Sequence, residues 1–211
     1  MVSAICHHIT KILAEHCPEA RIEYRKQCEQ KARDILSGSL GRLTHEAVED
    51  FLNALDSDTD RAGGSKRLGR FHPLLSVPNR ENIRKCDPKN LDALFSAVFR
   101  SEALDKVDVL RQGLKGVGNG LISSLLYLKN PDKYNIFLGT LSKGLLTVYP
   151  DKRSTFNYSR DQFDKNYSAF NDLVNRLRSE CSLVPQQVDI VLTVLAEEAE
   201  ETGSYCYARE T

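Results

Sequence analysis

The chain has 211 residues, of which 41% are hydrophobic, and this is enough apolar material for one large domain or two small ones. Its 29 basic and 29 acidic residues cancel, which excludes a globally basic body, so a nucleic-acid surface would need local segregation of charge. No apolar run approaches the ~20 residues that span a bilayer and no secretory signal opens the chain, so the sequence predicts an intracellular, cytoplasmic protein without a membrane partner.

Helical periodicity begins at the N-terminus. Two helices are expected over residues 3–16 and 19–36, separated near Pro18, and a third follows the potential cap Thr44. Its apolar stripe consists of Val48, Phe51, Leu52 and Leu55.

The cysteines form no Cys-x-x-Cys pair, and in a chain of this size without a secretory signal they are expected to be reduced. Three of them recur every 11 residues, which would place them on one helix face as small buried hydrophobes rather than metal ligands. No metal or other cofactor is therefore expected. The six are Cys6, Cys17, Cys28, Cys86, Cys181 and Cys206, of which the first three show the repeat.

The segment 56–80 has no helical stripe, so the sequence predicts a long loop there. Its part from residue 61 onward is basic and lacks acidic residues, so its side chains could neutralise phosphates, while a solvated linker is the alternative. A boundary near residue 60 would divide the chain into an N-terminal helical subdomain (1–60), a basic loop or linker (61–80), a second helical domain (81–200) and a tail (201–211). The candidate phosphate contacts are Arg61, Lys66, Arg67, Arg70, His72 and Arg80.

Beyond this loop the helical pattern returns. Asp87-Pro88 reads as a cap followed by proline in the first turn of a helix. Further helices are expected over 138–149, from 159 to about 180, and from Pro185 onward. The last of these has little polar face, so we expect it to be buried at the centre. The predicted fold class is all-α, a helical bundle.

Two glycines flank one aliphatic residue between two helical patterns, in the run from Leu114 to Gly120. This spacing is typical of a helix-hairpin-helix turn, in which backbone amides opening the second helix could receive a phosphate oxygen. A tight corner between packed helices is an equally weighted alternative. The candidate nucleic-acid contacts here are Lys115, Gly116, Gly118, Asn119 and Gly120, with Lys129 and Lys133 extending the surface.

Over roughly residues 85–195 the chain resembles two groups of proteins. Its Leu-x-Gly-Val-Gly stretch and the following helix are similar to those of helix-hairpin-helix DNA glycosylases. The segment from Asn130-Pro131 to Tyr134 looks similar to helical recognition modules that precede the motor domain of McrB-type restriction proteins. The second resemblance implies recognition of a modified base in anti-phage restriction, with a separate or fused motor or nuclease domain as partner.

The chain departs from both groups. Asn119 and Gly120 stand where bifunctional glycosylases have a lysine, and no aspartate stands some twenty residues further on. No phosphate-binding loop of a motor protein is present. The five histidines are paired with no nucleophile, so we assign no catalytic residue. The favoured function is therefore recognition of nucleic acid, most plausibly DNA, with a glycosylase without lyase activity and a helical protein-interaction module as the alternatives.

Overall fold

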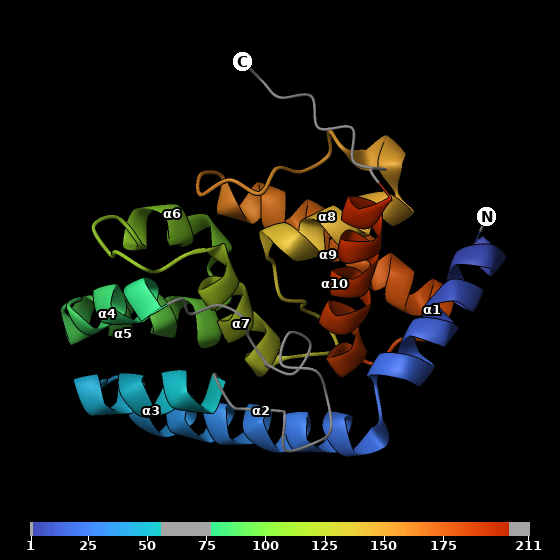
Figure 1. Ribbon diagram of the computed structural model, residues 1–211. Helices are drawn as coiled ribbons and strands as arrows, with labels where there is room; N and C mark the ends of the chain where they lie inside the picture. The colour runs from blue at the N-terminus through green and yellow to red at the C-terminus, as the bar shows by residue number, and fades with distance from the viewer. Residues whose placement is uncertain (1, 56–76, 203–211) are drawn as a thin grey trace.

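The computed structural model describes residues 2–55 and 77–202, and every regular element in these two ranges is helical. The predicted all-α class is confirmed, and the helices share one continuous apolar core (Figure 1). The helices are α1 (Val2–His16), α2 (Glu19–Ser39), α3 (His45–Leu55), α4 (Val77–Arg84), α5 (Pro88–Phe99), α6 (Val107–Leu110), α7 (Asn119–Lys129), α8 (Gly139–Val148), α9 (Phe163–Cys181) and α10 (Pro185–Glu201), with 3-10 turns at Leu104–Lys106 and Pro150–Lys152.

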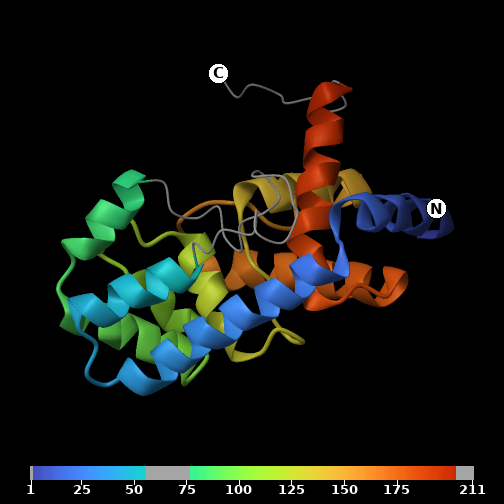
Figure 2. The ribbon, with the colours of Figure 1, turned by 60° about the horizontal axis from the view of Figure 1, so that its bottom comes forward.

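Two of the predicted helix starts use the expected caps. The Thr44 hydroxyl accepts a hydrogen bond from the amide of Ala47 at 3.2 Å, and α3 begins directly after it. The Asp87 carboxylate accepts one from the amide of Lys89 at 2.9 Å, with Pro88 as the first residue of α5. Helices α2 and α3 then lie side by side along one edge of the molecule, as both ribbon views show (Figure 2).

The loop predicted over 56–80 ends earlier than expected. Helix α4 occupies Val77–Arg84, so the prediction is wrong for residues 77–80. Arg80 lies on this helix, where its guanidinium donates a hydrogen bond to Glu49 of α3 at 3.0 Å. Helix α4 forms because of tertiary packing. It packs on α3 and buries the side chain of Ile83 completely.

Helix α7 is the most enclosed element, rather than α10 as the sequence suggested. Every residue from Asn119 to Leu128 is buried, whereas α10 keeps an exposed side. Two serines on α7 are buried with their hydroxyls satisfied, because Ser123 and Ser124 both donate to the carbonyl of Gly120, at 3.0 and 2.9 Å.

Helix α9 begins at Phe163, four residues later than predicted. The residue before it, Gln162, has a left-handed backbone with φ of 55°, which a continuous helix cannot contain. Residues 159–162 are therefore not part of the helix. Ser159 lies beside the start of α7, where its carbonyl accepts a hydrogen bond from Asn119.

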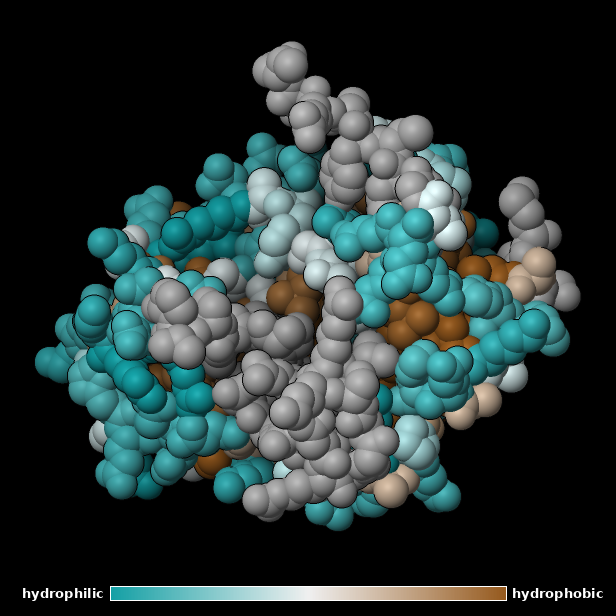
Figure 3. Space-filling model, in the orientation of Figure 1, coloured by the Kyte–Doolittle hydropathy of each residue, from teal (hydrophilic) through white to brown (hydrophobic). Residues whose placement is uncertain are grey.

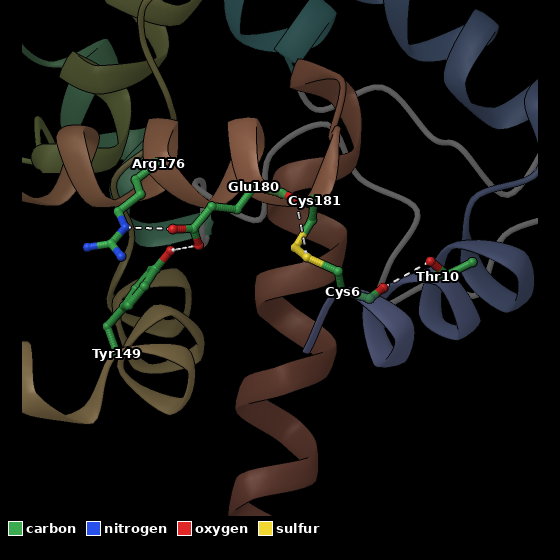
Figure 4. The surroundings of a disulfide bond; sticks show 6 residues. All are labelled: Cys6, Thr10, Tyr149, Arg176, Glu180 and Cys181. Atoms are coloured by element: carbon green, nitrogen blue, oxygen red, sulfur yellow. Dashed lines mark hydrogen bonds and ion pairs between the residues drawn. A yellow bond between two sulfur atoms is a disulfide. The ribbon is translucent and has the colours of Figure 1, made fainter. Parts of the chain in front are cut away.

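The expectation that all the cysteines are reduced is wrong for one pair. Cys6 of α1 and Cys181 at the end of α9 form a disulfide across a sequence separation of 175 (Figure 4). Their proximity follows from the packing of α1 against α9 and α10, which spacing along the chain does not reveal. The same figure shows Glu180, which accepts hydrogen bonds from Tyr149 at 2.9 Å and from Arg176 at 2.7 Å.

The other described cysteines, Cys17, Cys28 and Cys86, are free. Cys6 and Cys28 lie on different helices, so the expected shared face does not exist, because Pro18 separates α1 from α2. Burial raises the pKa of the Cys17 thiol to about 11, although Arg21 opposes this, and the thiol therefore stays protonated at neutral pH. Cys206 lies outside the described residues.

The division into two helical domains remains a prediction. Residues of α1, α2 and α3 belong to the same buried cluster as those of the later helices.

The described surface visible in Figure 3 is mainly hydrophilic, with hydrophobic residues showing in smaller areas. Within the described residues, we find no helix with the length and apolar character that a bilayer crossing requires.

Candidate functional site

The glycine turn connects a very short helix to a long one. Helix α6 has only four residues, preceded by the 3-10 turn, and α7 has eleven. The helix-hairpin-helix turn predicted for residues 114–120 therefore remains a prediction, because the helix before the turn has only four residues.

Gly116 has a structural role in this turn. Its φ is +83°, a left-handed conformation that favours glycine. A Cβ atom at this position would lie 2.5 Å from the carbonyl oxygen of Asn79 and 3.2 Å from the Cβ of Asn82, both on α4. The tight-corner interpretation thus holds for Gly116, because α4 crosses the turn here in close contact.

Gly118 is different, because nothing in the described structure demands a glycine. Its φ is −99°, which any residue adopts, and a Cβ added here would meet no heavy atom within 4 Å. Gly118 is exposed and occupies the N-cap position of α7, where Ser, Thr, Asp or Asn would supply a capping side chain. The first amide bonded within the helix is that of Ile122, to Gly118, so three preceding amides have no intrahelical acceptor.

Asn119 is a buried residue whose side chain links the turn to other segments. Its side chain is 4% exposed, accepts a hydrogen bond from Arg111 at 2.7 Å and donates one to the carbonyl of Ser159 at 2.6 Å. Arg111 also binds Asp108 at 2.5 Å, and Asp108 accepts from the amide of Phe163 at 3.1 Å. The Asn119 side chain therefore joins Ser159 to the glycine turn from a buried position, and its contact with nucleic acid remains a prediction.

This connection brings two residues to the turn that sequence reasoning did not select. Arg160 is exposed and donates hydrogen bonds from one terminal nitrogen to the carbonyls of Arg111 and Leu114, both at 3.2 Å. Tyr158 is 42% exposed, and burial of part of its ring raises the pKa of its hydroxyl, which therefore stays protonated at neutral pH. No local sequence signal links residues 158–160 to the turn 40 positions earlier.

A pocket of about 280 Å³ lies between these elements. It opens at the N-terminus of α7, and the described residues that line it supply a cation, an aromatic ring and amide groups but no carboxylate. We call it the turn pocket. Its lining residues are Asn79, Gly116, Val117, Gly118, Asn119, Tyr158, Ser159 and Arg160.

A second hollow, of about 450 Å³, lies on the other side of the point where α4 crosses the turn. It includes the exposed lysines Lys85 and Lys115 beside one carboxylate, that of Asp87, which caps α5. Lys115 is exposed beside the turn, and its contact with nucleic acid remains a prediction.

Other predicted contacts fall elsewhere. Lys129 and Lys133 lie at and beyond the opposite end of α7 and both pair with Glu102, at 3.2 and 2.7 Å. Hydrogen bonds from Lys133, which has the largest effect, and from Tyr134 and Lys129 lower the pKa of the Glu102 carboxyl to about 2. The two lysines do not extend the surface at the turn. Gly120 is buried within α7, and residues 61, 66, 67, 70 and 72 lie outside the described residues.

The Asn-Pro segment after α7 has a structural explanation. The Asn130 side chain accepts from the amides of Asp132 and Lys133, at 3.1 and 3.3 Å, which closes the turn. Asn135 then donates to Asn171 of α9 at 2.8 Å, and Arg178 donates to the carbonyl of Pro131 at 3.0 Å. These bonds join the segment between α7 and α9 to α9.

No family model, no curated protein and no solved structure matches this chain. The function therefore has to be inferred from the turn pocket, its charge and its exposed groups.

Proposed function

We propose that the protein binds nucleic acid, with backbone phosphates received at the start of α7 and on the basic side chains beside it. The observation that carries the proposal is Gly118, an exposed glycine that neither its φ nor its neighbours require. Without a side chain, it leaves the amides at the positive end of α7 open to close approach by an anion.

The charges around Gly118 support an anionic ligand. Arg160 lines the turn pocket and Lys115 lies on the adjoining hollow, and neither forms an ion pair with a described residue. Phosphate groups are the anions that such combinations of cations and helix amides bind in proteins. A zero net charge is compatible with this, because only local segregation matters.

Binding without catalysis is favoured over base excision. A glycosylase needs a carboxylate beside the base-sized pocket to stabilise the positive charge that develops on the sugar. The turn pocket has none among the lining residues that the structure describes. Recognition of a modified base for restriction, with a motor or nuclease partner, extends this proposal through the resemblance alone.

Gly118→Val tests the proposal. We expect the affinity for a fluorescein-labelled oligonucleotide to fall about tenfold or more, because the branched side chain blocks charge-assisted hydrogen bonds worth roughly 1.5–3 kcal/mol. The midpoint of thermal unfolding should change little, since the side chain enters open space. Both quantities are measured on the same preparation, by fluorescence anisotropy and by calorimetry.

Gly116→Ala is the comparison for stability and should lower the midpoint of thermal unfolding. Its left-handed φ and the 2.5 Å approach to Asn79 make it destabilising, whether or not a ligand binds nearby. A folded Gly118→Val protein with parental affinity would contradict the proposal, and the turn would then be only a corner between helices.

A further inference from the structure

The turn pocket holds an exposed aromatic side chain, Tyr158, that phosphate binding does not use. Phosphates need cations and amide donors, which Arg160 and the start of α7 already provide. An accessible aromatic ring beside them offers instead a flat face on which a nucleobase can stack.

The Tyr158 ring packs against Phe137 and Gly139, which restrict its movement. The ring lies edge-to-face against Phe137, with 5.1 Å between the ring centroids, and Phe137 is fully buried. A second brace is Gly139, where an added Cβ would lie 3.4 Å from the tyrosine ring. The backbone after it is fixed by the hydrogen bond from Asn119 to the Ser159 carbonyl at 2.6 Å. A ring braced in this way loses little conformational entropy when a ligand binds.

The size and polarity of the pocket fit one base. Its volume of about 280 Å³ lies just below the range of roughly 300–1,000 Å³ typical of small-molecule sites, so it admits one ring system and not a base pair. Asn79 lines the same pocket and can donate and accept hydrogen bonds at a base edge. In a duplex, base faces are covered by their stacked neighbours, so a protein ring reaches them only where a base is unpaired and unstacked.

We propose that the turn pocket receives one unpaired nucleobase stacked on Tyr158, so that the preferred ligand is a single strand rather than an intact duplex. This inference rests on the proposed function, since it places the base beside a phosphate bound at the turn. It adds a second kind of contact to the site, one that does not depend on charge.

The test uses Tyr158→Leu, with Tyr158→Phe as the matched variant that keeps the ring. The probes are fluorescein-labelled oligothymidylate, an oligomer of the same length with abasic sites throughout, and the oligothymidylate annealed to its complement. We expect Tyr158→Leu to lose roughly tenfold in affinity for oligothymidylate, as stacking losses of this kind do, while Tyr158→Phe retains it. The wild-type protein should bind the abasic oligomer and the duplex more weakly than oligothymidylate.

The decisive quantity is the ratio of affinities for oligothymidylate and the abasic oligomer. This ratio should collapse toward one in Tyr158→Leu, and a general loss of folding would not change it selectively. An unchanged ratio, or wild-type binding to duplex as tight as to the single strand, overturns the base pocket. If binding then still depends on Gly118, the proposed function stands. If the wild-type protein binds none of the probes at low salt, both proposals fail together.

Discussion

Gly144→Val should leave little folded protein, and Gly144→Ala should lower the free energy of unfolding by about 3 kcal/mol. Gly144 lies on α8 where this helix crosses α10, and a Cβ atom there would be 1.9 Å from the carbonyl oxygen of Leu192. The obstructing atom belongs to a helix backbone, so no side-chain rotation relieves the overlap. The two helices would have to separate, which opens the core around Val191 and Leu145.

Gly38→Ala is the matched control, because Gly38 is also helical but an added Cβ would have nothing within 4 Å. This substitution should raise stability by up to about 1 kcal/mol through helix propensity alone. Calorimetry on both variants checks the pair, with a midpoint decrease for Gly144→Ala of roughly 6–12 °C. A Gly144→Ala midpoint equal to that of Gly38→Ala would contradict the close contact between α8 and α10.

Arg25→Met should destabilise the protein by about 3–5 kcal/mol. Arg25 and Glu29 are 3% and 2% exposed, and their side chains are joined at 2.9 Å. Arg25 also pairs with Asp189 of α10, while the Tyr127 hydroxyl donates to Glu29 at 2.7 Å. Burial lowers the pKa of Arg25, but Asp189, Tyr127 and Glu29 raise it by more, so it stays charged.

Removing the guanidinium leaves the Glu29 carboxylate buried without its counter-charge. A carboxylate buried without a counter-charge is costly, and this cost is the main source of the expected loss of stability.

Urea unfolding at neutral pH measures the loss of stability. The control is Lys26→Met, since Lys26 is 53% exposed in its pair with Glu23 at 3.6 Å and should contribute less than about 1 kcal/mol. A deficit for Arg25→Met as small as that of Lys26→Met would show that the carboxylates find other partners.

Much of the fold could be predicted because several helices have local signals for both their stripes and their starts. Thr44 and Asp87-Pro88 are examples, and the structure confirms both. What could not be predicted depends on contacts between distant segments. Examples are α4, which forms against α3, and the disulfide of Cys6, whose partner is 175 residues away.

The candidate site shows the same division. Gly116 and Gly118 look alike in sequence, yet only the first has a positive φ and a close neighbour. Tyr158 and Arg160 were missed because a buried side chain, Asn119, brings them to the turn. The available signal was Asn119, a polar residue at the start of an otherwise largely apolar helix. Its pattern was interpreted as a candidate ligand contact.

We propose that phosphates bind on the cations beside the start of α7. The most direct test of this proposal is the affinity for oligothymidylate as a function of salt concentration, measured for the wild type and for Lys115→Ala/Arg160→Ala. Each lost phosphate contact to a single strand reduces the log-log slope by about 0.7, so the double variant should show a slope smaller by about 1.4. Both side chains are exposed, so the double variant should stay folded, with a small loss of stability from the two hydrogen bonds that Arg160 donates to backbone carbonyls. An unchanged slope, or a wild-type affinity that does not respond to salt, would contradict phosphate binding at this turn.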